Sequence, residues 1–85
     1  MHVYVFKKFR GNYYGGKETI ELFTDKDTAV KRIRENVEED FLFPFDKAEE
    51  CLRKMYEEVT FNDTSVYIDT GIGIFCYSVE KHGIH

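Results

Sequence analysis

The chain has 85 residues, of which 42% are hydrophobic and 16% aromatic, and its formal net charge at pH 7 is −4. This length fits one domain (residues 1–85) close to the lower limit of independent folding, and large aromatic rings, which bury about 150–250 Å² each, compensate for the short chain. Two cysteines are too few for a disulfide-stapled secreted domain, and no apolar stretch approaches the ~20 residues of a membrane span, so we expect a cytoplasmic protein that does not enter a membrane.

The first quarter of the chain predicts a β-hairpin. Residues 2–10 are dense in Val, Tyr and Phe, and residues 19–23 alternate apolar with polar side chains; both patterns are typical of strands. Residues 11–16 contain three glycines, which permit the positive φ angles of a turn.

Two amphipathic helices follow. Thr24 is the expected N-cap of the first helix, and Pro44 is expected to end it, since proline disfavours helical geometry in the residue before it. The apolar residues of this helix recur at helical spacing: Val30, Ile33, Val37 and Phe41. Asp46 opens a capping-box pattern for the second helix, whose apolar stripe runs from Ala48 to Val59.

A second hairpin is predicted after the helices. Residues 66–69 and 72–80 read as strands joined at Thr70-Gly71. The resulting order β-β-α-α-β-β predicts an α+β fold, a two-layer sandwich in which an antiparallel four-stranded sheet carries both helices on one face.

Charge is distributed unevenly along the sequence. Residues 1–34 carry eight Lys or Arg and four Asp or Glu, whereas residues 35–85 carry four and twelve. Folding alone gives no reason to separate the signs, so the separation suggests a charged partner.

The acidic side chains of the two predicted helices are the candidate partner-binding site. They are Glu35, Glu38, Glu39, Asp40, Glu49 and Glu50. If both helices cover one face of the sheet, their outer surfaces form a negative patch suited to a basic groove on a nucleic-acid-binding protein. Acid near the C-terminus of the first helix opposes the helix dipole, which favours a role other than stability. On the second helix, pairing with Lys and Arg at i,i+4 is equally typical of an ordinary solvated face.

An apolar segment lies directly after these acids. The sequence Phe41-Leu42-Phe43-Pro44-Phe45 places four bulky side chains around a proline, and they cannot all point the same way. We expect several of them to close the end of the core, and an exposed remainder would be a partner or self-association site inside a charged rim.

The predicted hairpin tip offers an alternative, a nucleic-acid-binding module. Its basic and aromatic residues are Lys7, Lys8, Arg10, Tyr13, Tyr14 and Lys17. Cations for phosphates and aromatic faces for bases are typical of single-strand contacts, although lysines also protect edge strands from aggregation. The isoelectric point near 5.3 weighs against nucleic acid as the partner.

A zinc-stabilised binding domain is a further alternative. Cys76, His82 and His85 lie within ten residues and are chemically suitable ligands, but their spacing matches no common zinc finger. Apart from this possible zinc ion, we expect no cofactor.

The sequence contains little that resembles a catalytic motif. Asp69-Thr70-Gly71 matches the triplet of aspartic proteases, but a hairpin turn explains it, and that chemistry needs a second carboxylate that shares one proton. We therefore expect a protein that is not an enzyme.

A small, tyrosine-rich acidic chain of this element order resembles the orphan proteins of bacteriophages and mobile elements. The resemblance is carried by residues 3–6, residues 20–24 and the helix start at residues 27–30, without a diagnostic motif. That group includes anti-CRISPR proteins, which block an effector by binding it, often through acidic surfaces. The resemblance implies a non-enzymatic inhibitor, monomeric or weakly dimeric, of a basic nucleic-acid-binding host protein.

Overall fold

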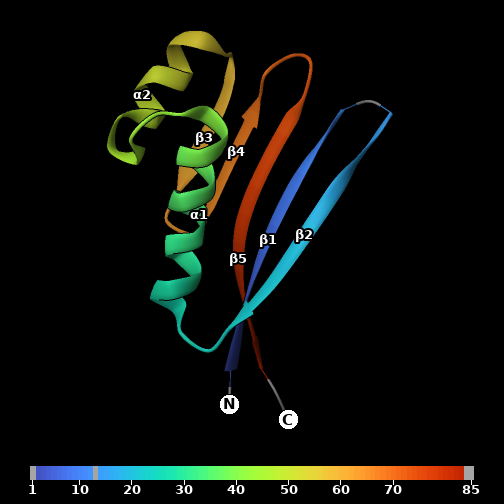
Figure 1. Ribbon diagram of the computed structural model, residues 1–85, viewed down its shortest axis with the longest axis vertical. Helices are drawn as coiled ribbons and strands as arrows, with labels where there is room; N and C mark the ends of the chain where they lie inside the picture. Colours follow the sequence, from blue (N-terminus) through green and yellow to red (C-terminus); the bar gives the residue numbers. More distant parts are fainter. Residues whose placement is uncertain (1, 13, 84–85) are drawn as a thin grey trace.

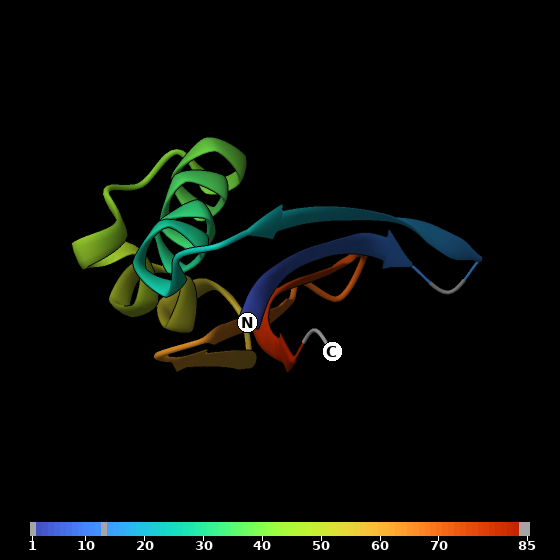
Figure 2. The same cartoon turned by 90° about the horizontal axis from the view of Figure 1, so that it is seen from below.

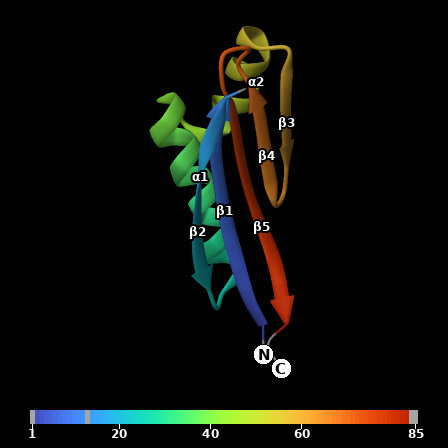
Figure 3. The same ribbon diagram turned by 90° about the vertical axis from the view of Figure 1, so that its right-hand side faces the viewer.

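The computed structural model describes residues 2–12 and 14–83. Its elements are β1 (His2–Asn12), β2 (Gly15–Phe23), α1 (Lys26–Phe41), α2 (Phe45–Met55), β3 (Glu58–Asn62), β4 (Ser65–Asp69) and β5 (Ile74–Gly83). The strands form one antiparallel sheet in the order β2-β1-β5-β4-β3, with β2 and β3 at its edges (Figure 3). Both helices lie on the same side of this sheet (Figures 1 and 2). The predicted α+β class is therefore confirmed, but the predicted number of four strands is wrong.

The additional strand is β3, which lies where the sequence predicts the end of the second helix. That helix ends at Met55, and Tyr56 is already extended, with φ −133°. Val59 fits the spacing of a helix, because it lies four residues after Met55, and also that of a strand, because it points inward together with Phe61 two residues later. Pairing of Val59 with Ile68 of β4 decides between the two structures.

The helix starts also differ from the predictions, by one residue in α1 and by two in α2. Asp25, not Thr24, is the N-cap of α1: its Oδ2 accepts a hydrogen bond from the Thr28 amide at 2.8 Å, and this bond lowers the pKa of Asp25. Helix α2 begins at Phe45 directly after Pro44, and Asp46 makes no side-chain cap.

The core lies between the helices and the inner face of the sheet. Its most deeply buried large side chains are Tyr77, Phe6, Leu52, Ile68, Val37 and Val66. In the apolar segment after α1, Phe41, Phe43 and Phe45 pack against this core, whereas Leu42 is 86% exposed. The segment therefore divides, with three phenylalanines directed inward and the leucine outward.

The outer face of the sheet has no helix over it. Ile20 and Leu22 of β2 are exposed there, and the Phe9 ring lies beside the cross-strand pair Gly11–Gly16, where an added Cβ would approach it to 2.6 Å. Within the described residues, neither helix is long and apolar enough to cross a membrane.

Candidate functional site

The acidic residues predicted to bind a partner do not form one uniform patch. Glu35 is bound to Arg32 at 3.0 Å, and Glu38 accepts a hydrogen bond from the Phe45 amide at 3.3 Å. Glu39 is exposed, and no ion pair or hydrogen bond of its side chain occurs among the described residues. Glu39 is thus the least compensated of these acids.

Glu49 and Glu50 on α2 each have a basic partner one turn away. Glu49 binds Arg53 at 2.8 Å, and Glu50 binds Lys54 at 3.4 Å. Exposed pairs of this kind are worth little stability, but they largely cancel the charge that a partner would meet. The i,i+4 pairing predicted for the second helix is therefore confirmed, and it weakens the acidic surface of α2.

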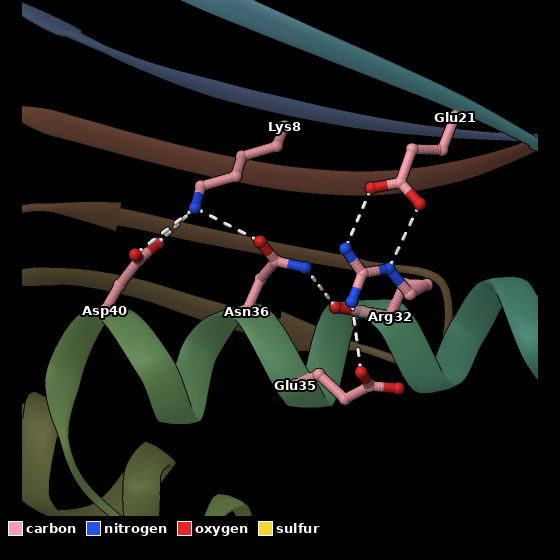
Figure 4. Close-up of polar contacts among 6 residues, drawn as sticks. All are labelled: Lys8, Glu21, Arg32, Glu35, Asn36 and Asp40. Atoms are coloured by element: carbon pink, nitrogen blue, oxygen red, sulfur yellow. Dashed lines mark hydrogen bonds and ion pairs between the residues drawn. The ribbon is translucent and has the colours of Figure 1, made fainter.

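Asp40 belongs to the interior between the helix layer and the sheet, and not to the outer surface. Its side chain is only 11% exposed and lies 2.9 Å from the Lys8 ammonium (Figure 4). The buried Tyr77 hydroxyl donates a hydrogen bond to it at 2.7 Å. Burial, and secondarily this hydrogen bond, raise the pKa of Tyr77 well above its usual value. Asp40 consequently joins the two layers and is not available to a partner.

Two further contacts extend this link between α1 and the sheet (Figure 4). Lys8 also donates to the Asn36 side-chain oxygen at 3.1 Å, and the side-chain nitrogen of Asn36 donates to the Arg32 backbone carbonyl at 2.7 Å. The Arg32 guanidinium binds Glu21 of β2 through two hydrogen bonds of 2.8 and 3.2 Å, which raise the pKa of Arg32. The inner polar residues therefore fix α1 against β1 and β2.

Leu42 is a site residue that the sequence could not single out. It ends α1 in the left-handed conformation, with φ 61°, and is the only non-glycine residue with positive φ among the described residues. This conformation costs a leucine about 1–2 kcal/mol, and glycine usually occupies such positions. The last turn of α1 contains no basic residue. We call Glu35, Glu38, Glu39 and Leu42 the α1-end surface.

The basic hairpin residues are divided between the two faces of the sheet. Lys7 lies on the outer face, where it binds Glu80 at 3.3 Å, whereas Lys8 points inward to Asp40. Arg10 and Lys17 are opposite each other in the β1–β2 register, on the same face as Lys8. The structure therefore gives no single surface that contains all the predicted cations.

Of the two hairpin tyrosines, Tyr14 is 98% exposed, whereas the predicted contact at Tyr13 lies outside the described residues. The alternative nucleic-acid site thus keeps Arg10, Lys17 and Tyr14 as accessible members.

The candidate zinc ligands are not brought together where they are described. Cys76 and His82 lie six residues apart on β5, a separation of about 20 Å at strand spacing. His82 binds Glu80 at 3.1 Å, and burial raises the pKa of the Cys76 thiol, which disfavours the thiolate that metals bind. His85 lies outside the described residues, within which no group of three or more potential ligands occurs.

The Asp69-Thr70-Gly71 triplet forms the turn between β4 and β5. The Gly71 amide donates to Asp69 Oδ1 at 2.8 Å, and Thr70 exchanges hydrogen bonds with the backbone of Gly73. Gly71 has φ 86°, which the turn requires. These local contacts account for the motif.

Comparisons with known proteins assign no relationship. No protein-family model matches the chain, and no curated protein and no solved structure matches it at a significant level. We therefore infer function from the residues and contacts of the chain itself.

Proposed function

We propose that the protein is a non-enzymatic inhibitor that binds a basic, nucleic-acid-binding protein through the α1-end surface. The observation that carries this proposal is Leu42, an exposed leucine held in a conformation that favours glycine. Backbone strain of this kind clusters at functional positions, and here it presents an apolar side chain directly to solvent.

The surroundings of Leu42 suit a protein interface. Glu38 and Glu39 occupy the preceding helical turn, which contains no base. An apolar anchor within a charged rim is the usual composition of an interface, in which the anchor supplies affinity and the rim speeds the encounter. Burial of the leucine side chain would contribute about 1.5–3 kcal/mol.

The acids contribute unequally to the proposed interface. The Glu39 carboxylate has no contact to break among the described residues. Glu38 accepts a hydrogen bond from the Phe45 amide at the start of α2, and Glu35 must give up its ion pair with Arg32 to bind a basic residue of the partner. Glu49 and Glu50 extend the acidic area but remain paired on α2. The partner therefore needs a basic surface with an adjacent apolar pocket.

The test is affinity capture from bacterial lysate at low and high salt, with mass spectrometry of the retained proteins. The wild type is expected to retain a basic nucleic-acid-binding protein, and high salt should weaken this retention because the rim is charged. Glu39→Lys should abolish it. Glu18→Lys is the matched control, since it makes the same charge change on β2, at an exposed position on the outer face of the sheet.

If Glu39→Lys and Glu18→Lys retain the same proteins as the wild type, the α1-end surface is not the binding site. Recovery of nucleic acid alone, lost after nuclease treatment, would instead support the hairpin alternative.

A further inference from the structure

A cleft of about 700 Å³ lies where the β1–β2 hairpin, the end of α1 and the β4–β5 turn meet. It borders the α1-end surface, because Asp40 and Phe41, which line it, directly precede Leu42. These three parts of the chain come together at the same end of the molecule (Figure 1). Arg10 and Lys17 line the hairpin side of the cleft, and Phe41, Tyr56 and Phe75 line the other side. Its volume falls within the range of small-molecule sites, roughly 300–1,000 Å³.

The two cations of the cleft repel each other. Arg10 and Lys17 are directly opposite in an antiparallel register, a geometry that places their Cβ atoms about 4.5–5.5 Å apart. Like charges in this position destabilise a sheet. Among the described residues neither has a carboxylate within ion-pair distance, whereas the neighbouring Lys7 and Lys8 each do.

The charge directed into the cleft is therefore positive. Asp40 also lines the cleft, but Lys8 neutralises it and the Tyr77 hydroxyl occupies its second oxygen. Two uncompensated positive charges remain, on Arg10 and Lys17. Their sum matches a phosphate monoester, which carries about −1.5 to −2 at pH 7 and offers three acceptor oxygens. A single carboxylate would compensate only one of them.

Aromatic packing holds the guanidinium in position before a ligand arrives. The Arg10 Cζ atom lies 5.3 Å from the centre of the Phe75 ring, and Phe75 packs edge-on against Phe41 with ring centres 4.8 Å apart. Planar guanidinium groups bind phosphate oxygens in pairs, and a fixed orientation reduces the entropy lost on binding.

We propose that this cleft binds a phosphate-bearing small molecule of nucleotide size. Its phosphate contacts Arg10 and Lys17, and its remaining part lies against Tyr56 and Ile72, which is 90% exposed at the β4–β5 turn. This site shares no residue with the α1-end surface and is tested by different variants, so either proposal can fail without the other.

The experiment is titration of the isotope-labelled protein with ADP, followed by amide NMR. ADP should shift the amides of Gly11, Gly16 and Gly73 in a saturable manner, and adenosine, which lacks the phosphates, should bind at least about tenfold more weakly. Arg10→Ala and Lys17→Ala should each weaken ADP binding by about tenfold or more, whereas Lys54→Ala on α2 should leave it unchanged.

Lys17→Ala removes one of two repelling charges, so it should fold at least as stably as the wild type, whereas Arg10→Ala removes the same repulsion together with the contact between Arg10 and Phe75. Lys17→Ala therefore tests the cleft without a loss of packing. Absence of saturable ADP binding below a Kd on the order of 1 mM would overturn the proposal. Equal weakening by the Lys54 variant would also overturn it. Binding of a thymidine oligonucleotide without binding of ADP would replace it with a single-stranded nucleic acid site.

Discussion

Replacement of Asp40 by alanine should destabilise the protein far more than loss of any other predicted partner-binding acid. The change removes the carboxylate that binds Lys8 and accepts a hydrogen bond from the Tyr77 hydroxyl. Breaking a fully buried ion pair costs about 3–5 kcal/mol. Here Lys8 is 20% exposed and keeps its hydrogen bond to Asn36, so we expect a smaller loss of about 2–4 kcal/mol.

Equilibrium unfolding in urea at pH 7, followed by circular dichroism, measures this loss. Glu50→Ala is the control, because Glu50 and Lys54 are each 75% exposed and such pairs contribute about 0–1 kcal/mol. Asp40→Asn should lie between the two, since the amide oxygen can still accept from Tyr77. A loss below about 1 kcal/mol for Asp40→Ala would refute the interior placement of Asp40.

Three further predictions concern single residues. Burial raises the pKa of Tyr77, so this side chain stays protonated in the folded protein, whereas in the unfolded chain it deprotonates near about pH 10. Above about pH 10 the free energy of unfolding should therefore fall by up to about 1.4 kcal/mol per pH unit more in the wild type than in Tyr77→Phe. Urea unfolding at several pH values across that range measures this difference. Gly16→Ala would place a Cβ 2.8 Å from the Arg10 carbonyl oxygen and should cost about 1–3 kcal/mol in urea unfolding. Gly83→Ala should be tolerated, because apart from its chain neighbours no described residue lies within 4 Å of the added Cβ. Lys17→Glu should turn the repulsion with Arg10 into attraction and raise stability by about 0.2–1 kcal/mol, an increase that shrinks in high salt.

The fold class could be predicted from the sequence because in most elements the apolar residues recur at the spacing of either a helix or a strand, and not of both. Helix α1 appears close to its expected position. The strands of the first hairpin extend into residues 11–16, which were predicted as a turn, and α2 ends at Met55 and not at Val59. Strand β3 was missed because Val59 satisfies two periods at once, and only its pairing with Ile68 distinguishes them. Distant pairing of this kind leaves no local signal in the chain.

The candidate sites were harder to predict than the fold. Helical spacing identified the acids at the end of α1, but not that Asp40 faces Lys8, 32 residues earlier in the sequence. Strand alternation could have indicated that Lys7 and Lys8 point to opposite faces. The repulsive pair Arg10–Lys17 required the hairpin register, and the exposure of Leu42 required the conformation of one residue.

If the proposed function is right, the strained conformation of Leu42 serves to bind a partner. Leu42→Gly tests this link, with urea unfolding and affinity capture on the same preparation. Glycine relieves the left-handed strain, so the variant should be more stable than the wild type by about 1 kcal/mol and yet lose the captured protein. Capture at the wild-type level by this more stable variant would contradict the proposed function.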